Sequence, residues 1–563
     1  MTEISDRTTA PGLLRKARRY TSRHVGATLS RLAGTAPPTT PYRVDRAVPI
    51  TMRDGVELLA DHYIPDIDTP AGTLLVRGPY GRRWPFSATY AAAYAARGYH
   101  VVLQSVRGTF GSGGQFDPTV HEAADGADTA AWLREQPWFT GRFGTVGLSY
   151  LGATQWALLQ DPPPELAAAV IIVGPHDFAD TTWGSGSFAV NDFLGWSDMV
   201  AHQEDPGMRR ALLRQLRARR DVARAAAGLP LGASGRRLLG PGAPWWESWV
   251  SHADPADTFW DPYRFPRALE QSRVPVLLIG GWQDAFLDQT LAQYRALRDH
   301  GGEVALTVGP WTHTNMMAKA APRVLRESLQ WLTTHVAGEP ATPRSRVRVC
   351  VTGGGGWLEL PDWPPATTET VRYLGGDGQL TASPATDPAA SSTFTFDPLD
   401  PTPTIGGRLL SPNSGRRRDD ALAARSDVLA FTGDPLPADL VVYGAPVVEL
   451  AHSSDNPHVD LWVRISEVDA RGHSHNVSDG YIRLRPDRDA ATVTLHLDPI
   501  AHRFAAGSRL RLLVAGGCFP RFAPNLGTGE SVFEGTRTAP ATHVISDLGS
   551  RLLLPVGAPR PAN

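Results

Sequence analysis

The sequence has few cysteines, no long hydrophobic run and almost no net charge. Its two cysteines, Cys350 and Cys518, lie 168 positions apart (518 − 350), and both fall in predicted strands. A disulfide scaffold or a cysteine metal site is therefore not expected, and we interpret both as buried thiols in a reducing compartment, the cytoplasm. No run approaches the ~20 apolar residues that a membrane-spanning helix needs. A formal charge of −2 gives no electrostatic reason to expect nucleic acid or a membrane as partner.

Residues 1–41 differ from the rest of the chain in being basic. They lack the continuous apolar core of a secretory signal and carry Arg15, Lys16, Arg18, Arg19, Arg23 and Arg31. We interpret them as a flexible or partly helical arm that ends in a proline-containing linker at 36–38.

Residues 42–174 and 266–338 show short apolar runs that alternate with helical patterns. A chain of 563 residues is expected to form roughly two to four domains. The alternation predicts an α/β domain with a mostly parallel, doubly wound sheet. The predicted strands are 73–77, 99–104, 143–148, 168–173, 276–280 and 304–308, and the predicted helices are 88–96, 123–134, 151–159, 287–299 and 324–336.

Residues 175–265 interrupt this alternation. They contain an arginine- and alanine-rich helical stretch at 208–227 and a cluster of tryptophans, Trp245, Trp246, Trp249 and Trp260. An insertion ahead of the last strands is expected to lie over their carboxyl ends as a helical cap. The tryptophans either contribute to a binding site there or only fill the core of the cap.

Residues 339–563 change to period-two alternation between Gly, Pro, Asp and Asn turns. This pattern predicts an all-β sandwich or jelly roll. Its predicted strands are 346–352, 370–374, 392–396, 447–451, 459–465, 481–485, 491–497, 509–515 and 543–545.

Ser149 lies where a buried strand turns sharply into a helix. Small residues at Gly147 and Gly152 let strand and helix approach closely, which exposes the serine oxygen to a substrate. This arrangement is typical of a nucleophile elbow, although Leu151 occupies the place of the second glycine in the usual G-x-S-x-G pattern.

A serine nucleophile needs a histidine base that is oriented by a carboxylate. Asp284 follows the predicted strand 276–280, and His313 follows the strand 304–308, so both lie at the carboxyl edge of the sheet. The order serine, acid, histidine is that of α/β-hydrolases. Asp288 competes for the acid role, but it falls inside the following helix, which favours Asp284.

Two groups are candidates for stabilising the oxyanion of a tetrahedral intermediate. The backbone N–H of Tyr150 follows the nucleophile directly, and the loop after the first strand offers the phenol of Tyr80.

These residues lie in five segments that resemble the cocaine esterase family, a branch of the X-Pro dipeptidyl-peptidase (S15) superfamily. The segments are R-G-P-Y (77–80), R-G-T-F-G-S-G-G (107–114), G-L-S-Y-L-G (147–152), G-G-W-Q-D (280–284) and G-P-W-T-H (309–313). G-G-C-F-P (516–520) and N-L-G-T-G (525–529) are similar to the jelly roll of that family. The resemblance covers about residues 45–555 and implies an α/β-hydrolase core, a helical cap and a jelly roll. It also implies Ser149 as nucleophile, His313 as base, Asp284 as acid and Tyr80 with the Tyr150 amide as oxyanion hole.

Aromatic residues near these positions favour a small-molecule ester or amide with an apolar or aromatic acyl group. The residues assigned to substrate binding are Trp183, Trp282, Phe286 and Trp311, with Trp245 a further candidate. An X-Pro dipeptidyl-peptidase or an α-amino-acid ester hydrolase is the main alternative, and it needs a carboxylate for the substrate ammonium. Asp177, Asp180, Asp192, Asp198 and Glu204 are the candidates for that carboxylate.

A non-enzymatic alternative is an inactive hydrolase core with a carbohydrate-binding jelly roll.

Acyl transfer by a serine needs no metal or organic cofactor, and none is expected. His473 and His475 lack an obvious third ligand nearby. The sequence is compatible with a homodimer.

Overall fold

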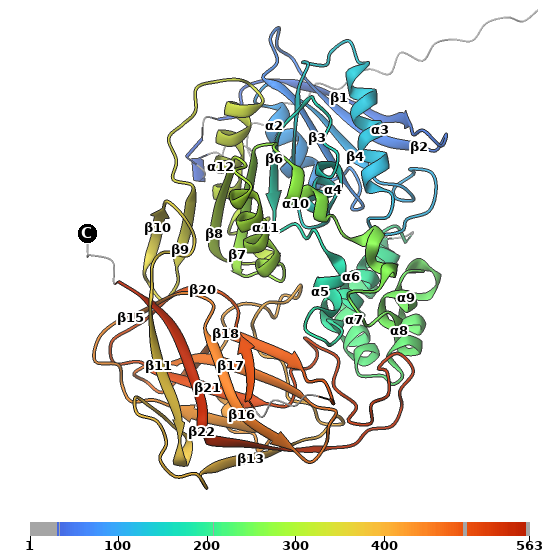
Figure 1. Ribbon diagram of the computed structural model, residues 1–563. Helices are drawn as coiled ribbons and strands as arrows, with labels where there is room; N and C mark the ends of the chain where they lie inside the picture. Colours follow the sequence, from blue (N-terminus) through green and yellow to red (C-terminus); the bar gives the residue numbers. More distant parts are fainter. Residues whose placement is uncertain (1–30, 33, 36, 206–207, 488–491, 559–563) are drawn as a thin grey trace, which may run out of the picture.

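The computed structural model describes residues 31–32, 34–35, 37–205, 208–487 and 492–558, so most of the predicted arm at 1–41 lies outside it. A ten-stranded sheet forms the centre of the first domain (Figure 1). Its order is β1-β2-β4-β3-β5-β6-β7-β8-β9-β10, parallel from β4 to β9 and antiparallel at both edges. The strands are β1 (Tyr42–Thr51), β2 (Glu57–Pro65), β3 (Gly72–Gly78), β4 (Tyr99–Ser105), β5 (Phe143–Leu148), β6 (Leu166–Ile172), β7 (Val276–Gln283), β8 (Val304–Thr312), β9 (Val347–Val351) and β10 (Gly356–Leu360).

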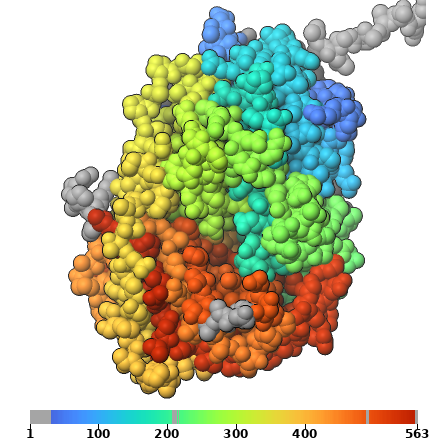
Figure 2. All heavy atoms as spheres, viewed as in Figure 1, coloured from blue at the N-terminus to red at the C-terminus, as the bar shows by residue number. Residues whose placement is uncertain are grey.

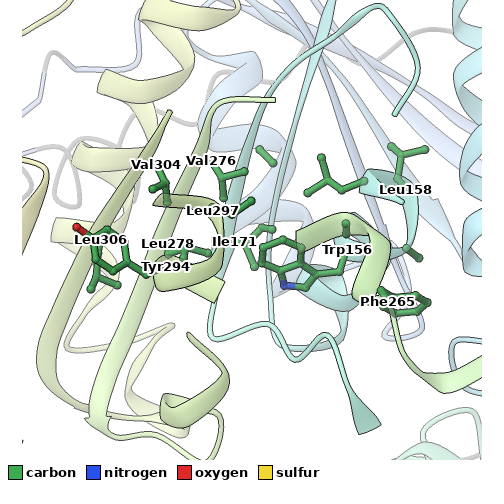
Figure 3. Close-up of a cluster of buried hydrophobic side chains, with 14 of the residues drawn as sticks. Trp156, Leu158, Ile171, Phe265, Val276, Leu278, Tyr294, Leu297, Val304 and Leu306 are labelled. Atoms are coloured by element: carbon green, nitrogen blue, oxygen red, sulfur yellow. The ribbon is translucent and has the colours of Figure 1, made fainter. Parts of the chain in front are cut away.

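Helices cover both faces of this sheet because its central strands are apolar on both sides. One face packs against α3 (Glu122–Arg134), α4 (Tyr150–Leu159), α10 (Pro266–Gln271) and α11 (Leu287–Asp299). Figure 3 shows Tyr294 and Trp156 from two of these helices next to Leu306, Leu278 and Ile171 of the strands. The other face packs against α2 (Ala93–Ala95), which continues η1 (Ser87–Ala92), and α12 (Ala321–His335). The α/β prediction is confirmed.

The cap consists of short helices between β6 and β7. They are α5 (Phe178–Trp183), α6 (Val190–His202), α7 (Met208–Ala226), α8 (Leu231–Leu239), η2 (Gly240–Gly242), α9 (Trp246–Ser251) and η3 (Thr258–Tyr263). Trp246, Trp249 and Trp260 are at most 1% exposed and form the centre of an aromatic core. The tryptophan cluster therefore stabilises the cap itself. Late residues of the chain, including Ala523 and Val532, pack against the same core. Figure 2 shows the late part of the chain, in red, next to the green cap.

The C-terminal domain is all β, as predicted. Its long last strand, β22 (Ala541–Gly557), pairs with four other strands, β11, β13, β15 and β16. The elements before it are β11 (Thr368–Gly375), η5 (Gly376–Gly378), β12 (Gln379–Thr381), β13 (Ser391–Phe396), α13 (Asp420–Ala423), β14 (Val428–Thr432), β15 (Leu440–Gly444), β16 (Val447–Ser454), β17 (Asp460–Val468), β18 (Ser474–Arg483), β19 (Thr492–His496), β20 (Ile500–Phe504) and β21 (Arg509–Ala515).

The strand predicted at 346–352 belongs to the first sheet instead of opening the β domain. As β9 it pairs in parallel with β8, and β10 then pairs with it as an antiparallel edge. Thr352 at its end donates its N–H to the Ala501 carbonyl at 2.8 Å, so the same segment also joins the two domains. Alternation in a short run indicates a strand, but it does not say which sheet the strand completes.

Candidate active site

Ser149 occupies a strained turn between β5 and α4. Its φ of 57° and ψ of −123° are unusual for a residue with a side chain, and its N–H donates to the Ile172 carbonyl at 2.8 Å. A Cβ at Gly147 would lie 2.4 Å from the Leu151 Cβ, and one at Gly152 would lie 2.7 Å from the Gly174 Cα. The two glycines therefore permit the close approach that the turn requires.

Leu151, which departs from the usual elbow pattern, is accommodated by a glycine on another strand. A Cβ at Gly78 would lie 2.5 Å from the Leu151 Cδ1. The leucine side chain thus fills space that Gly78 of β3 leaves open, and the elbow does not need a glycine at position 151.

Asp284 and His313 meet at the edge where β7 and β8 end. Because these strands are parallel neighbours, the residues that follow them lie side by side. The His313 Nδ1 lies 2.7 Å from the Asp284 Oδ2, and the Phe286 N–H donates to the other carboxylate oxygen at 2.8 Å. Asp284 is fully buried, while 13% of the His313 side chain is exposed, at the start of η4 (His313–Asn315). Asp288, the competing candidate for the acid, instead forms an ion pair with Arg408.

Ser149, His313 and Tyr80 line one cavity of about 1200 Å³. Its apolar wall consists of Trp84, Phe86, Phe110, Leu148, Trp196, Met199, Met317 and Leu410. Its charged groups are Arg46, Asp61, Arg82, Arg83 and Glu204. Asp61 forms ion pairs with Arg46 and Arg82, so its charge is already compensated.

The Tyr80 hydroxyl is within hydrogen-bonding reach of the Ser149 side chain. Burial raises the pKa of Tyr80 to about 12, while hydrogen bonds with Trp196 and Ser149 act in the opposite direction. The phenol is therefore protonated at neutral pH. Because the Trp196 indole N–H donates to its oxygen at 3.0 Å, the tyrosine proton is available to another acceptor.

Tyr150 has a backbone N–H that is free to bind the oxyanion, and its side chain is held by buried hydrogen bonds. As the first residue of α4 it has no intrahelical acceptor for that N–H. Its hydroxyl donates to the Glu122 Oε1 at 3.0 Å and accepts from the Thr119 N–H at 2.7 Å. Glu122 is paired in turn with Arg77 at 3.0 Å. This buried network fixes the first turn of the helix behind Ser149.

None of the four aromatic residues assigned to substrate binding lines this cavity. Trp183 is 2% exposed in the core of the cap and donates its indole N–H to the Trp249 carbonyl at 2.8 Å. Trp282 donates to the Cys350 carbonyl at 2.7 Å, and Trp311 packs against Trp357. Phe286 lies with its ring edge-on to the His313 ring, at a centroid distance of 5.4 Å, and supports the imidazole from behind. Proximity in sequence to a strand end does not show which side of that end faces the cavity.

The cavity wall comes largely from segments that carried no motif. Trp196 and Met199 lie on α6, Phe86 precedes η1, and Leu410 belongs to the C-terminal half of the chain. In the sequence, only the predicted cap at 175–265 indicated that Trp196 and Met199 could lie near the site. Trp245, the further candidate, lies behind Trp196 and donates to the Ser197 hydroxyl at 3.0 Å.

Among the five carboxylates considered for an ammonium group, Glu204 alone lines the cavity at Ser149 within the described part of the chain. Its Oε1 accepts the Phe110 N–H at 2.9 Å. Asp180 and Asp192 line a separate polar cavity, Asp198 is paired with Arg214, and Asp177 caps the N-terminus of α5.

The described residues contain no cluster of three or more metal-ligating side chains, and no helix among them is long and apolar enough to cross a bilayer. His473 is paired with Asp469 at 3.5 Å.

Comparisons with known proteins match both domains. A family model described as X-Pro dipeptidyl-peptidase (S15 family) matches residues 54–315. A second, described as X-Pro dipeptidyl-peptidase C-terminal non-catalytic domain, matches residues 340–551. The cocaine esterase of Rhodococcus sp. (strain MB1 Bresler) is 32% identical over 542 residues, which cover 87% of this chain and 93% of the relative.

Solved structures of similar fold include an α-amino acid ester hydrolase and an aminopeptidase. The first has a TM-score of 0.77 at 21% identity and covers 98% of this chain and all of its own. The second, from a marine sediment archaeon (Thaumarchaeota archaeon), has a TM-score of 0.77 at 22% identity and covers 92% of this chain and 97% of its own. At these identities the likeness shows the fold.

Proposed function

The chain is a serine hydrolase that belongs to the X-Pro dipeptidyl-peptidase (S15) family, and on that premise we propose that it cleaves carboxylic esters with apolar or aromatic acyl groups. The observation that carries the proposal is the Asp284–His313 hydrogen bond at 2.7 Å, beside a cavity that the histidine shares with Ser149 and Tyr80. Nucleophile, base and oxyanion donor thus open onto the same space.

In the proposed reaction His313 takes the proton of the Ser149 hydroxyl as its oxygen attacks the ester carbonyl. Asp284 accepts the N–H at Nδ1 and so keeps the other ring nitrogen free to act as base. The tetrahedral intermediate collapses when His313 gives that proton to the leaving alkoxide, which departs as alcohol. Water then attacks the acyl-enzyme by the same route and releases the acid and the free serine.

We assign two hydrogen-bond donors to stabilise the negative charge that develops on the carbonyl oxygen. The Tyr80 hydroxyl and the Tyr150 N–H both flank the elbow, and neither needs to ionise. Donors that are already oriented stabilise the transition state without reorganisation.

The apolar wall of the cavity supports the choice of substrate. Phe86, Trp196 and Leu410 offer aromatic and aliphatic surface and no charge. Cys350 and Cys518 are not joined by a disulfide, which is compatible with the reducing, cytoplasmic compartment that we propose.

A second candidate function, hydrolysis of α-amino esters or X-Pro peptides, is supported by Glu204. Its carboxylate forms no ion pair among the described residues and lines the cavity near Phe110. A substrate ammonium could bind there.

The deciding experiment compares a 4-nitrophenyl ester of an aromatic acid with an X-Pro-anilide on the purified full-length chain. We expect kcat/KM for the ester to exceed that for the anilide at least 100-fold, and both activities to disappear in Ser149→Ala. A preference for the anilide that is lost in Glu204→Gln would favour the second candidate. Near-normal ester hydrolysis by Ser149→Ala would contradict both.

A further inference from the structure

A groove of about 570 Å³ lies beside the cavity at Ser149. It runs between α6 and α7 on one side and residues 410–413 with Pro520 on the other. Its wall is mostly apolar and includes Met199, Ala218, Val222, Ala226, Leu410 and Pro412. Asp198 is the one carboxylate among the described residues of this wall. It is neutralised by Arg214, which also donates to His202 at 2.7 Å.

The groove and the cavity at Ser149 share part of their walls. Gly195, Met199, Gln203 and Leu410 line both. The two spaces therefore meet at one short stretch of α6 and at the loop that faces it.

Gly195 lies at this junction, and neither backbone conformation nor packing requires it to be glycine. It lies inside α6 without the positive φ that favours glycine, and a Cβ added to it would meet nothing within 4 Å. At Gly147 and Gly152 of the elbow, by contrast, an added Cβ would clash. A glycine inside a helix lowers its stability relative to alanine. The missing side chain leaves free space at this junction, which we call the passage.

The walls of this passage are held by hydrogen bonds to the catalytic domain and the cap. Asp192 in the first turn of α6 accepts the Leu410 N–H at 2.9 Å. Gln203 after the end of α6 donates to the Pro79 carbonyl at 2.9 Å, next to Tyr80. The passage is thus fixed relative to the site of reaction.

We propose that the groove binds a long apolar chain of the ester substrate, which reaches it from Ser149 past Gly195. This inference rests on the proposed esterase function and narrows it to esters with a long apolar chain on one side. Each methylene that becomes fully buried increases kcat/KM by up to about fourfold.

The test measures kcat/KM for two series of esters on the full-length chain. One series varies the acyl chain of 4-nitrophenyl esters from acetyl to dodecanoyl, and the other varies the alkyl chain of acetate esters. We expect kcat/KM to rise at least tenfold from the shortest to the octyl member in one of the two series. The series that shows this rise tells whether the acyl part or the alcohol part of the ester binds in the groove. Gly195→Val should lower this long-to-short ratio at least tenfold. Ala218→Leu, which narrows the groove alone, should lower the ratio in the same direction.

The matched control is Gly376→Val, at an exposed glycine in η5 whose added Cβ also meets nothing within 4 Å. It should leave the ratio unchanged. Equal ratios in wild type and Gly195→Val, with the acetyl ester still hydrolysed, would overturn the groove assignment and leave the esterase proposal intact. If wild type hydrolyses no ester of either series, both proposals fail together.

Discussion

At the scale of single residues, the candidate site depends on side chains that follow strand ends. Ser149, Asp284 and His313 could be predicted because glycine spacing and buried strands are local signals in the sequence. The structure brings Asp284 and His313 into a hydrogen bond and places His313 in one cavity with Ser149. Trp196 and Leu410 could not be predicted, since no local pattern shows which surface of the cap or of the distant loop faces the elbow.

Tyr80 is the residue whose proposed role is most open to direct measurement. Tyr80→Phe removes the hydroxyl and keeps the ring that stacks on Phe86 at a centroid distance of 5.2 Å. We expect kcat to fall on the order of 10²–10³, the usual cost of losing one oxyanion donor, with a smaller change in KM. Tyr90→Phe, in the buried cluster on the same side of the sheet, is the control and should retain activity. A loss below about threefold in Tyr80→Phe would show that another group supplies the second donor.

At the scale of elements, long apolar runs were predicted well and edge strands poorly. The predicted runs at 276–280 and 304–308 lie within β7 and β8, and helix α11 has the predicted bounds. β1 was missed because it is largely exposed and its apolar residues do not form a continuous run. β2 is mostly buried, and it was missed because Asp61 and His62 interrupt its apolar residues. β9 was predicted as a strand but assigned to the wrong sheet, because helix α12 separates it from its partner β8 in the sequence.

The pairing of β2 with β4 predicts a pH dependence of stability. His62 and His100, from these two strands, are hydrogen-bonded at 3.0 Å, and Trp138 stacks on both rings. Burial, with smaller effects of His100 and Arg43, lowers the pKa of His62 to about 3, and burial with Arg43 lowers that of His100 to about 4. Unfolded histidines titrate near 6.5, so between pH 6.5 and about 4 the unfolded chain binds more protons, and stability falls as pH falls.

The expected loss is about 2 kcal/mol for each histidine at pH 5. The double variant His62→Leu/His100→Leu lacks both groups, so its Tm should fall less than that of wild type between pH 7 and pH 5. His176 and His543 also have lowered pKa values, to about 4 each, and remain in both proteins. An equal fall in both proteins would refute this assignment.

At the scale of the whole molecule, the buried Arg408 of the β domain forms an ion pair with the catalytic domain. Arg408, whose side chain is 7% exposed, lies 2.5 Å from Asp288 of α11 and 3.1 Å from Asp498 after β19. Burial acts to lower the pKa of Arg408, but Asp288 and Asp498 raise it above its ordinary value. Because Leu410 of the cavity wall is only two positions away, this interface also positions part of the site. Sequence patterns define each domain and carry no information on such long-range contacts.

Arg408→Met should therefore destabilise the protein much more than a change at a surface pair. Removing the guanidinium leaves the carboxylate of Asp498, whose side chain is 10% exposed, with Arg521 at 3.7 Å as its nearest remaining cation among the described residues. We expect a loss on the order of 3 kcal/mol in the free energy of unfolding. Arg503→Met breaks a more exposed pair with Asp439 and should cost less than about 1 kcal/mol. Denaturant unfolding of the two variants measures the difference, and similar costs would contradict a structural role for Arg408.

The central claim is that Ser149 is the nucleophile of this hydrolase, and covalent labelling with a fluorophosphonate tests it most directly. The protein should incorporate one equivalent of probe, and mass spectrometry of the digested adduct should place it on the Ser149 side chain. Ser149→Ala should not be labelled, and His313→Ala should react far more slowly because its serine lacks a base. Labelling at another residue would contradict the claim. A wild-type protein that is not labelled would also contradict it, and would favour an inactive core that binds carbohydrate through its β domain.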